Sequence, residues 1–205
     1  MTTISYSLLA MILIIGIFAS KNSSSETTPT QIGTSVEAAS WLSGDHHIHS
    51  RFSVGWNMES GVPQPIIGGD AIYPTAMNAL MARYHNLSWM VTTDHGGPKH
   101  SKVNLDLAYP ELVRSRRVVP ELLQFYGLEL NTPGGDHSSI IIPHTTAEAD
   151  HLLNLESQFD SREICPADEA RNHSQQMLLA LKKMQSIHPS PLVFAHHPSR
   201  SATQL

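Results

Sequence analysis

Residues 88–95 read SWMVTTDH, a short apolar segment followed directly by a carboxylate and an imidazole. The segment Ser88–Thr93 is rich in β-branched and aromatic side chains, which predicts a strand. Asp94 and His95 then lie at the carboxyl end of that strand. We therefore expect a buried strand that presents two ionisable side chains at one edge of a sheet.

Similar segments occur on both sides of this one. Four other apolar runs predict strands, at Trp41–Ser50, Leu122–Leu130, Ser138–Ile142 and Leu192–Ala195. Apolar residues at helical spacing predict helices at Asp70–His85, part of Leu105–Val118, Thr145–Gln158 and Pro166–Ile187. Thr145 and Glu148 have the spacing of a capping box at the start of the third helix. Short strands that alternate with helices predict an α/β fold with a parallel sheet, either open or closed into a barrel.

Ionisable side chains follow the carboxyl ends of four of these five strands, which is the end where active sites form in such folds. Side chains two positions apart share a face of a strand, so Asp45, His47 and His49 are expected to point the same way. Clustered imidazoles and carboxylates are costly to bury without a partner. Mixed ligands of this kind suit Zn, Mn or Fe. The complete set is Asp45, His47, His49, Asp94, His95, Glu129, Asp136, His137, His196 and His197.

Each short motif also has a purely structural explanation. Asp94 could cap a helix, Glu129 could form a salt bridge, and His196 and His197 could mark a strand end. The metal interpretation therefore depends on the joint pattern. The other histidines show no ligand spacing and are interpreted as surface or satisfied residues: His85, His100, His144, His151, His173 and His188.

The composition limits the classes of function. The chain has 205 residues, 40% of them hydrophobic and 15% charged, which is typical of a globular domain. The formal net charge is -5 and the 13 Lys and Arg residues form no long run, so nucleic-acid binding is not expected. The 13 histidines stand out, since imidazole is the commonest metal ligand. Cys165 is the only cysteine, which excludes an internal disulfide and a CxxC zinc motif.

The amino-terminal region predicts export. The apolar run Leu8–Ala19 is shorter than the roughly 20 residues that span a bilayer, and it has the length of a signal-peptide core. We interpret 1–20 as a signal peptide or N-terminal anchor, 21–40 as a flexible linker, and 41–205 as the hydrolase domain. The protein is then periplasmic or extracellular, with membrane contact only through an uncleaved N-terminal segment. The alternative is a buried N-terminal segment.

The motifs, taken in order, resemble the polymerase and histidinol phosphatase (PHP) family. They are DHHIH followed by Ser50, then TDH, then GLE, then a histidine that opens a strand, then HPSR, and they extend from about Gly44 to Arg200. The resemblance implies a distorted seven-stranded β/α (TIM-like) barrel, of which about five strands are present here. It also implies two or three divalent metal ions and hydrolysis of a small phosphorylated substrate.

The resemblance implies a role for individual residues. Glu129 corresponds to a carboxylate that bridges two metal ions. Arg200 corresponds to an arginine that contacts phosphate, and we place Asp94 beside it in the catalytic group. The implied metal ligands are His47, His49, His95, Glu129, His137 and His197, with His196 as the alternative to His197.

Two departures from the family pattern leave rival functions open. Val54 occupies a position where many members carry an acidic residue, so one metal ion is bound differently or is missing. The late Asp-x-His pair of the family is not found before Leu205, so we expect a fragment of a longer protein that is inactive alone. The rivals are a metal-dependent amide or lactone hydrolase and a non-catalytic PHP-like binding module, which Val54 favours.

Overall fold

The computed structural model describes residues 40–196 of the chain. The predicted leader and the predicted linker, apart from Ser40, lie outside these residues, and so do His197 and Arg200. Within the described part, no helix has both the length and the apolar character needed to cross a membrane.

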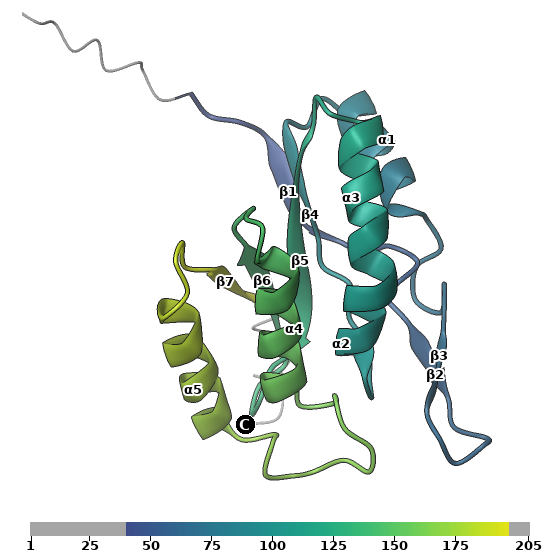
Figure 1. Ribbon diagram of the computed structural model, residues 1–205, viewed down its shortest axis with the longest axis vertical. Helices are drawn as coiled ribbons and strands as arrows, with labels where there is room; N and C mark the ends of the chain where they lie inside the picture. The colour runs from purple at the N-terminus through teal and green to yellow at the C-terminus, as the bar shows by residue number, and fades with distance from the viewer. Residues whose placement is uncertain (1–39, 197–205) are drawn as a thin grey trace, which may run out of the picture. The chain divides into compact units, whose positions relative to one another are not determined.

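The main sheet has five strands in the order β1–β4–β5–β6–β7 (Figure 1). The strands correspond to the five predicted segments: β1 Gly44–Ile48, β4 Trp89–Thr92, β5 Leu123–Asn131, β6 His137–Ile142 and β7 Leu192–His196. The sheet curls so strongly that its two edge strands come into contact, with 3.2 Å between the Nε2 atoms of His46 on β1 and His196 on β7. The described residues therefore form a curled open sheet, and the closed seven-stranded barrel implied by the resemblance is not present among them.

The prediction of a parallel sheet is wrong for its second half. Strands β1, β4 and β5 are parallel, but β6 is antiparallel to both β5 and β7. The reason is the short connection Thr132–Asp136 between β5 and β6, because a parallel crossover needs about a dozen residues or more. Gly134 makes the tight turn with φ of 68°, a left-handed conformation that glycine adopts at little cost. The hairpin places His137, at the start of β6, beside the end of β5.

Helices cover one face of the sheet (Figure 1). They are α1 Thr75–Tyr84, α2 His100–Val103, the π-helix η1 Asn104–Ala108, α3 Tyr109–Val118, α4 Glu148–Phe159 and α5 Ser174–Gln185. The helix starts predicted at Asp70 and Pro166 were wrong. Helix α1 begins only after Pro74, so Asp70 lies in irregular chain, and α5 begins after His173, whose ring accepts a hydrogen bond from the Gln175 amide. A small hairpin of β2 Gly55–Asn57 and β3 Gln64–Ile66 was missed, because three-residue strands show no periodicity.

The two-residue period of β5 separates the core from the site. Tyr126, Leu128 and Leu130 are buried against α4 and α5 in the main apolar core. Alternate residues lie on the other, inner face, where Phe125 lines an apolar hollow of about 500 Å³ and Glu129 lies nearer the carboxyl end of the strand. The inner face therefore carries a carboxylate near the carboxyl end of β5 and an apolar hollow further back along the strand.

The capping box predicted for α4 does not form. Ala147 precedes the helix and no side chain caps it, while Glu148 is fully buried. The Glu148 carboxylate instead accepts hydrogen bonds from the guanidinium of Arg116 on α3, and the ring of His144 lies 3.1 Å from it. Burial without a charged partner would be costly, so this ion pair ties α3 to α4.

A second buried polar network lies between α2, η1 and α4. His100 is 1% exposed, and its ring contacts the Glu156 carboxylate through Nδ1 and the Phe52 carbonyl through Nε2 at 2.8 Å. Both partners accept hydrogen bonds, which favours an imidazolium that donates from both nitrogens. Burial lowers the pKa of His100, but the charge of Glu156 outweighs it and raises the pKa to about 9.

The pH dependence of the free energy of unfolding should reflect the interaction between His100 and Glu156. A folded-state pKa above the unfolded value gives a stabilisation that is complete below about pH 6.5 and lost as pH rises through about 9. We expect the free energy of unfolding of the chelator-treated chain to fall by on the order of 3 kcal/mol across this range. Urea denaturation at several pH values measures it. His100→Gln should flatten the profile, and an equal fall in native and variant chains would show that another group is responsible.

Candidate metal centre

One end of the inner face gathers imidazoles around a single carboxylate. Glu129, near the end of β5, is 2% exposed. Its Oε2 lies 3.2 Å from Nε2 of His49, 3.7 Å from Nε2 of His47 and 3.8 Å from Nε2 of His95. Its Oε1 lies 2.7 Å from Nδ1 of His137 and 3.9 Å from Nδ1 of His196. We call this set the His/Glu cluster: His47, His49, His95, Glu129, His137 and His196.

The His/Glu cluster contains two groups of atoms that are able to hold a metal ion. One group is His47, Glu129 and His196, and the other is His49, His95 and Glu129, with the ligand atoms of each group within 4.8 Å of one another. Nitrogen and oxygen ligands about 2.0–2.2 Å from a tetrahedral ion lie about 3.3–3.6 Å from each other. The separations around Glu129 are close to that spacing, and Glu129 belongs to both groups.

Hydrogen bonds behind His49 fix which of its nitrogens faces the cluster. The Ser53 hydroxyl donates to Oδ1 of Asp94 over 3.0 Å and lies 2.6 Å from Nδ1 of His49. Because its one proton is used on Asp94, the hydroxyl accepts from Nδ1–H of His49. The Nε2 atom of His49 then turns a lone pair towards Glu129 and towards Nε2 of His47, which lies 3.0 Å away. A metal ion at this point would accept the lone pair of His49 and bind an oxygen of Glu129.

Asp94 is not part of the His/Glu cluster, but it hydrogen-bonds residues that orient the cluster. It is 2% exposed and accepts hydrogen bonds from the backbone amide and hydroxyl of Ser50, besides the one from Ser53. The structure thus places Asp94 as a positioning residue for the turn after β1 and for the His49 ring. Partners of this kind orient metal-binding imidazoles and raise their basicity.

His47 and His196 are held in a similar way. The hydroxyl oxygens of Ser139 and Thr93 each lie 3.2 Å from Nδ1 of His47. The Ser139 hydroxyl also lies 3.0 Å from Nε2 of His196. Ser139 on β6 therefore connects the rings of β1 and β7, and both rings are oriented towards Glu129.

The electrostatics of the cluster match neutral imidazole ligands around an ionised carboxylate. Burial is the main cause that lowers the pKa of His47 to about 4, and it also lowers the pKa of His95. Burial works to raise the pKa of Glu129, but hydrogen bonds with His137 and His49 outweigh it and hold that pKa well below its usual value. The pKa of His49 is raised, because the Glu129 carboxylate outweighs the effect of burial. Metal ligands must be deprotonated, and these shifts favour the deprotonated forms of His47, His95 and Glu129.

The structure brings together five of the six predicted ligands and adds others. His197 lies outside the described residues, and His196, the alternative, occupies the cluster. Asp45 does not share the face of His47, because the register of β1 against β4 shifts between Asp45 and Ile48 and the Asp45 carboxylate binds the His47 amide. The same shift turns His46 towards His196.

Asp70 is a member of the site that sequence reasoning missed. Its Oδ2 lies 3.4 Å from Nε2 of His95 and 3.9 Å from Nδ1 of His49. The loop is held by a hydrogen bond from the Asp70 amide to the Ser53 carbonyl, and by Gly69, where a Cβ would come within 2.6 Å of the Gly55 amide nitrogen. Asp70 thus offers a carboxylate to the group of His49 and His95 from a loop distant in sequence.

Val54 does not contribute to the His/Glu cluster. It is 5% exposed and packs with Phe52 and Val103 in a small apolar core. The acidic residue that the resemblance expects at this position is therefore replaced by an apolar one, whereas Asp70 supplies negative charge nearby.

Replacing Asp70 by Asn should weaken one of two metal ions selectively. The change keeps the shape and removes the charge beside His49 and His95, so we expect the affinity of one ion to fall by about 10- to 100-fold. Titration of the metal-free chain against a competing chelator measures both affinities. Asp150→Asn, an exposed carboxylate on α4, is the matched control. Unchanged affinities in Asp70→Asn would exclude Asp70 from the site.

No family model, curated protein or solved structure matches the chain. Membership of the PHP family thus stays a prediction from the motifs.

Proposed function

We propose that the chain is a metal-dependent phosphoesterase whose divalent ions lie in the His/Glu cluster. The observation that carries this proposal is that two groups of imidazoles share one buried carboxylate, Glu129. A shared carboxylate holds two cations at a short separation, which is the arrangement that enzymes use to displace a phosphoryl leaving group. Zn, Mn and Fe suit the mixture of imidazole and carboxylate ligands.

The accessibility of the ligands favours catalysis over a structural role. Structural zinc sites are closed by four protein ligands, whereas catalytic sites keep a position open. Among residues 40–196 each group offers three ligands, with the Asp70 carboxylate close to the second group, and the side chains of His47, His49 and His95 are 22%, 23% and 22% exposed. Solvent and a small substrate therefore have access to the site.

In this proposal the residues of the site have separate roles. Divalent ions bound here would polarise a phosphoryl oxygen and supply a water-derived nucleophile at neutral pH. Glu129 and the surrounding imidazoles hold the ions, while Ser53 and Asp94 orient His49. Arg200 is proposed to contact the phosphate of a small phosphorylated substrate, since a guanidinium binds phosphate oxygens in a fork.

The finer fold and the location are part of the same proposal. A curled sheet with helices on one face is compatible with a section of a distorted β/α barrel of the PHP type. The apolar run Leu8–Ala19 supports export of the protein.

Metal content and hydrolysis of the full chain test the proposal. We expect the chain to bind about two ions of Zn²⁺, Mn²⁺ or Fe²⁺, one for each group of ligands, as counted by elemental analysis. From the full-length protein, rather than from residues 1–205 alone, we also expect hydrolysis of simple phosphomonoesters that stops on chelation and returns with metal. Bound metal without hydrolysis of any ester would favour a binding module, and hydrolysis of amides or lactones in place of phosphate esters would favour the rival enzyme.

A further inference from the structure

A pocket opens directly beside the His/Glu cluster, and the proposed chemistry does not yet use it. It has a volume of about 430 Å³ and includes His95 in its lining, so it adjoins the group of His49, His95 and Glu129. We call it the His95 pocket. Its volume lies in the range of about 300–1,000 Å³ that is usual for sites of small organic ligands.

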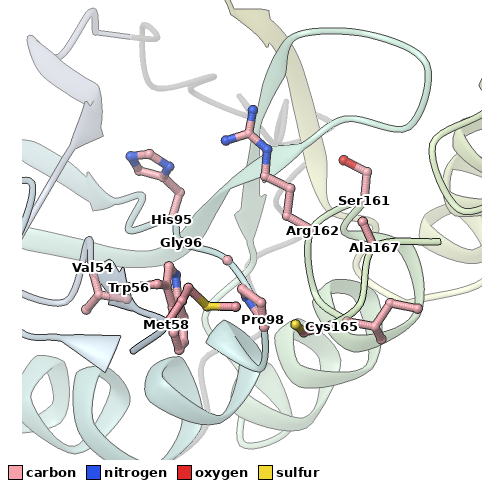
Figure 2. Close-up of a pocket in the computed structure, with 12 residues that line it drawn as sticks. Val54, Trp56, Met58, His95, Gly96, Pro98, Ser161, Arg162, Cys165 and Ala167 are labelled. Carbon is pink, nitrogen blue, oxygen red and sulfur yellow. The ribbon is translucent and has the colours of Figure 1, made fainter. Parts of the chain in front are cut away.

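The walls of the His95 pocket are mainly apolar. One wall comes from the first hairpin strand and its neighbours, with Val54, Trp56 and Met58, and the opposite wall from the loop after α4, with Ile164. In Figure 2 the side chains of Trp56 and Met58 lie across from Pro98 and Cys165, below His95. A charged or strongly hydrated group would lose its water in such a pocket without gaining a partner.

Both walls are fixed in place. The indole of Trp56 packs on Gly97, where a Cβ would come within 2.7 Å of the indole nitrogen. In the opposite wall, the Arg162 amide donates to the buried Asp160 carboxylate, and the Glu163 carboxylate binds Ser101. The pocket is therefore preformed, which reduces the entropy that a ligand would lose on binding.

One cation lies at the edge of this apolar surface. The Arg162 side chain lines the pocket and is exposed, and Figure 2 shows it extending towards the same end as His95. An anionic group held at the His/Glu cluster would meet the guanidinium there, while an attached organic group would extend down between Trp56 and Ile164.

We propose that the His95 pocket binds an aromatic or similarly apolar organic group of the substrate, and that Arg162 contacts the phosphoryl group of the same molecule. This inference rests on the proposed phosphoesterase function and names its substrate class, a phosphate ester of an apolar alcohol. Trp56 and Ile164 are then specificity-determining residues, whereas Arg162 acts on every phosphate ester alike.

Two esters with leaving groups of similar basicity test this class. The metal-loaded full-length protein should hydrolyse 2-phenylethyl phosphate with a kcat/KM about 10- to 30-fold above that of ethyl phosphate, because the phenyl ring is removed from water. Ile164→Asp should abolish the preference, and Leu178→Asp, an exposed leucine on α5 that does not line the pocket, should keep it. Arg162→Gln should lower kcat/KM for both esters by a similar factor. Equal rates for the two esters in the native chain would overturn the proposal.

Alkylation of Cys165 gives a readout that does not depend on turnover. Cys165 lines the pocket and is the only cysteine of the chain. On the metal-loaded chain, the non-hydrolysable 3-phenylpropylphosphonate should slow alkylation by about tenfold, and propylphosphonate at the same concentration should not. Protection without hydrolysis of either ester would support the pocket and contradict the phosphoesterase function. Hydrolysis without selective protection would contradict the pocket alone.

Discussion

Replacing Glu129 by Gln is expected to empty both metal groups and to abolish hydrolysis. Glu129 supplies an oxygen to each group, and the amide has only one acceptor oxygen and no charge. We expect kcat/KM for a phosphomonoester to fall by about 10³-fold or more, together with the loss of both bound ions. Elemental analysis and steady-state kinetics on the same preparations measure the two effects.

The control for this variant is Glu121→Gln. Glu121 carries the same charge, but its side chain is 56% exposed and pairs only loosely with Arg83. This control should keep the metal content and activity of the native chain. A Glu129→Gln protein that keeps both ions and most of its activity would show that the carboxylate does not bridge them.

Replacing Arg116 by Ala is expected to give the largest loss of stability. Arg116 donates to the fully buried Glu148, and its Nε also donates to the Gln124 carbonyl at 2.8 Å. Removing the guanidinium deprives the buried carboxylate of its arginine partner, leaves the exposed ring of His144 beside it, and should lower the free energy of unfolding by about 3–5 kcal/mol. Thermal and urea denaturation measure the loss.

The neighbouring Arg117 offers a matched control. It lies on the same helix but is exposed, so Arg117→Ala should change the free energy of unfolding by less than about 0.5 kcal/mol. Equal losses in the two variants would mean that the buried ion pair does not determine the effect.

The sequence predicts best the strands that are buried on both faces. The run Ser88–Thr93 predicted β4 within one residue at each end, because a buried strand is a short continuous apolar segment. The direction of β6 was mistaken, although the short turn Thr132–Asp136 already excluded a parallel crossover. The hairpin β2–β3 left no signal, since its short strands are stabilised by contacts that are not encoded in a local pattern.

In the candidate site too, contacts within one hairpin could be predicted from the sequence, whereas contacts from a distant loop could not. Glu129 and His137 meet because the hairpin of β5 and β6 brings them together, and the motifs indicated both residues. Asp70 could not be found this way, because its approach to His95 depends on how the loop before α1 packs on Ser53. The contact of His46 with His196 was not predicted, because the shift in β1 breaks the alternation that assigns side chains to faces.

Crystals of the chain soaked in Mn²⁺ or Zn²⁺, with anomalous diffraction recorded at the metal absorption edge, test the central claim most directly. We expect two anomalous peaks on either side of the Glu129 carboxylate, each within about 2.5 Å of one of its oxygens. One ion should also contact His47 and His196, and the other His49 and His95. A single ion that does not touch Glu129, or ions bound only elsewhere on the chain, would contradict the two-metal centre.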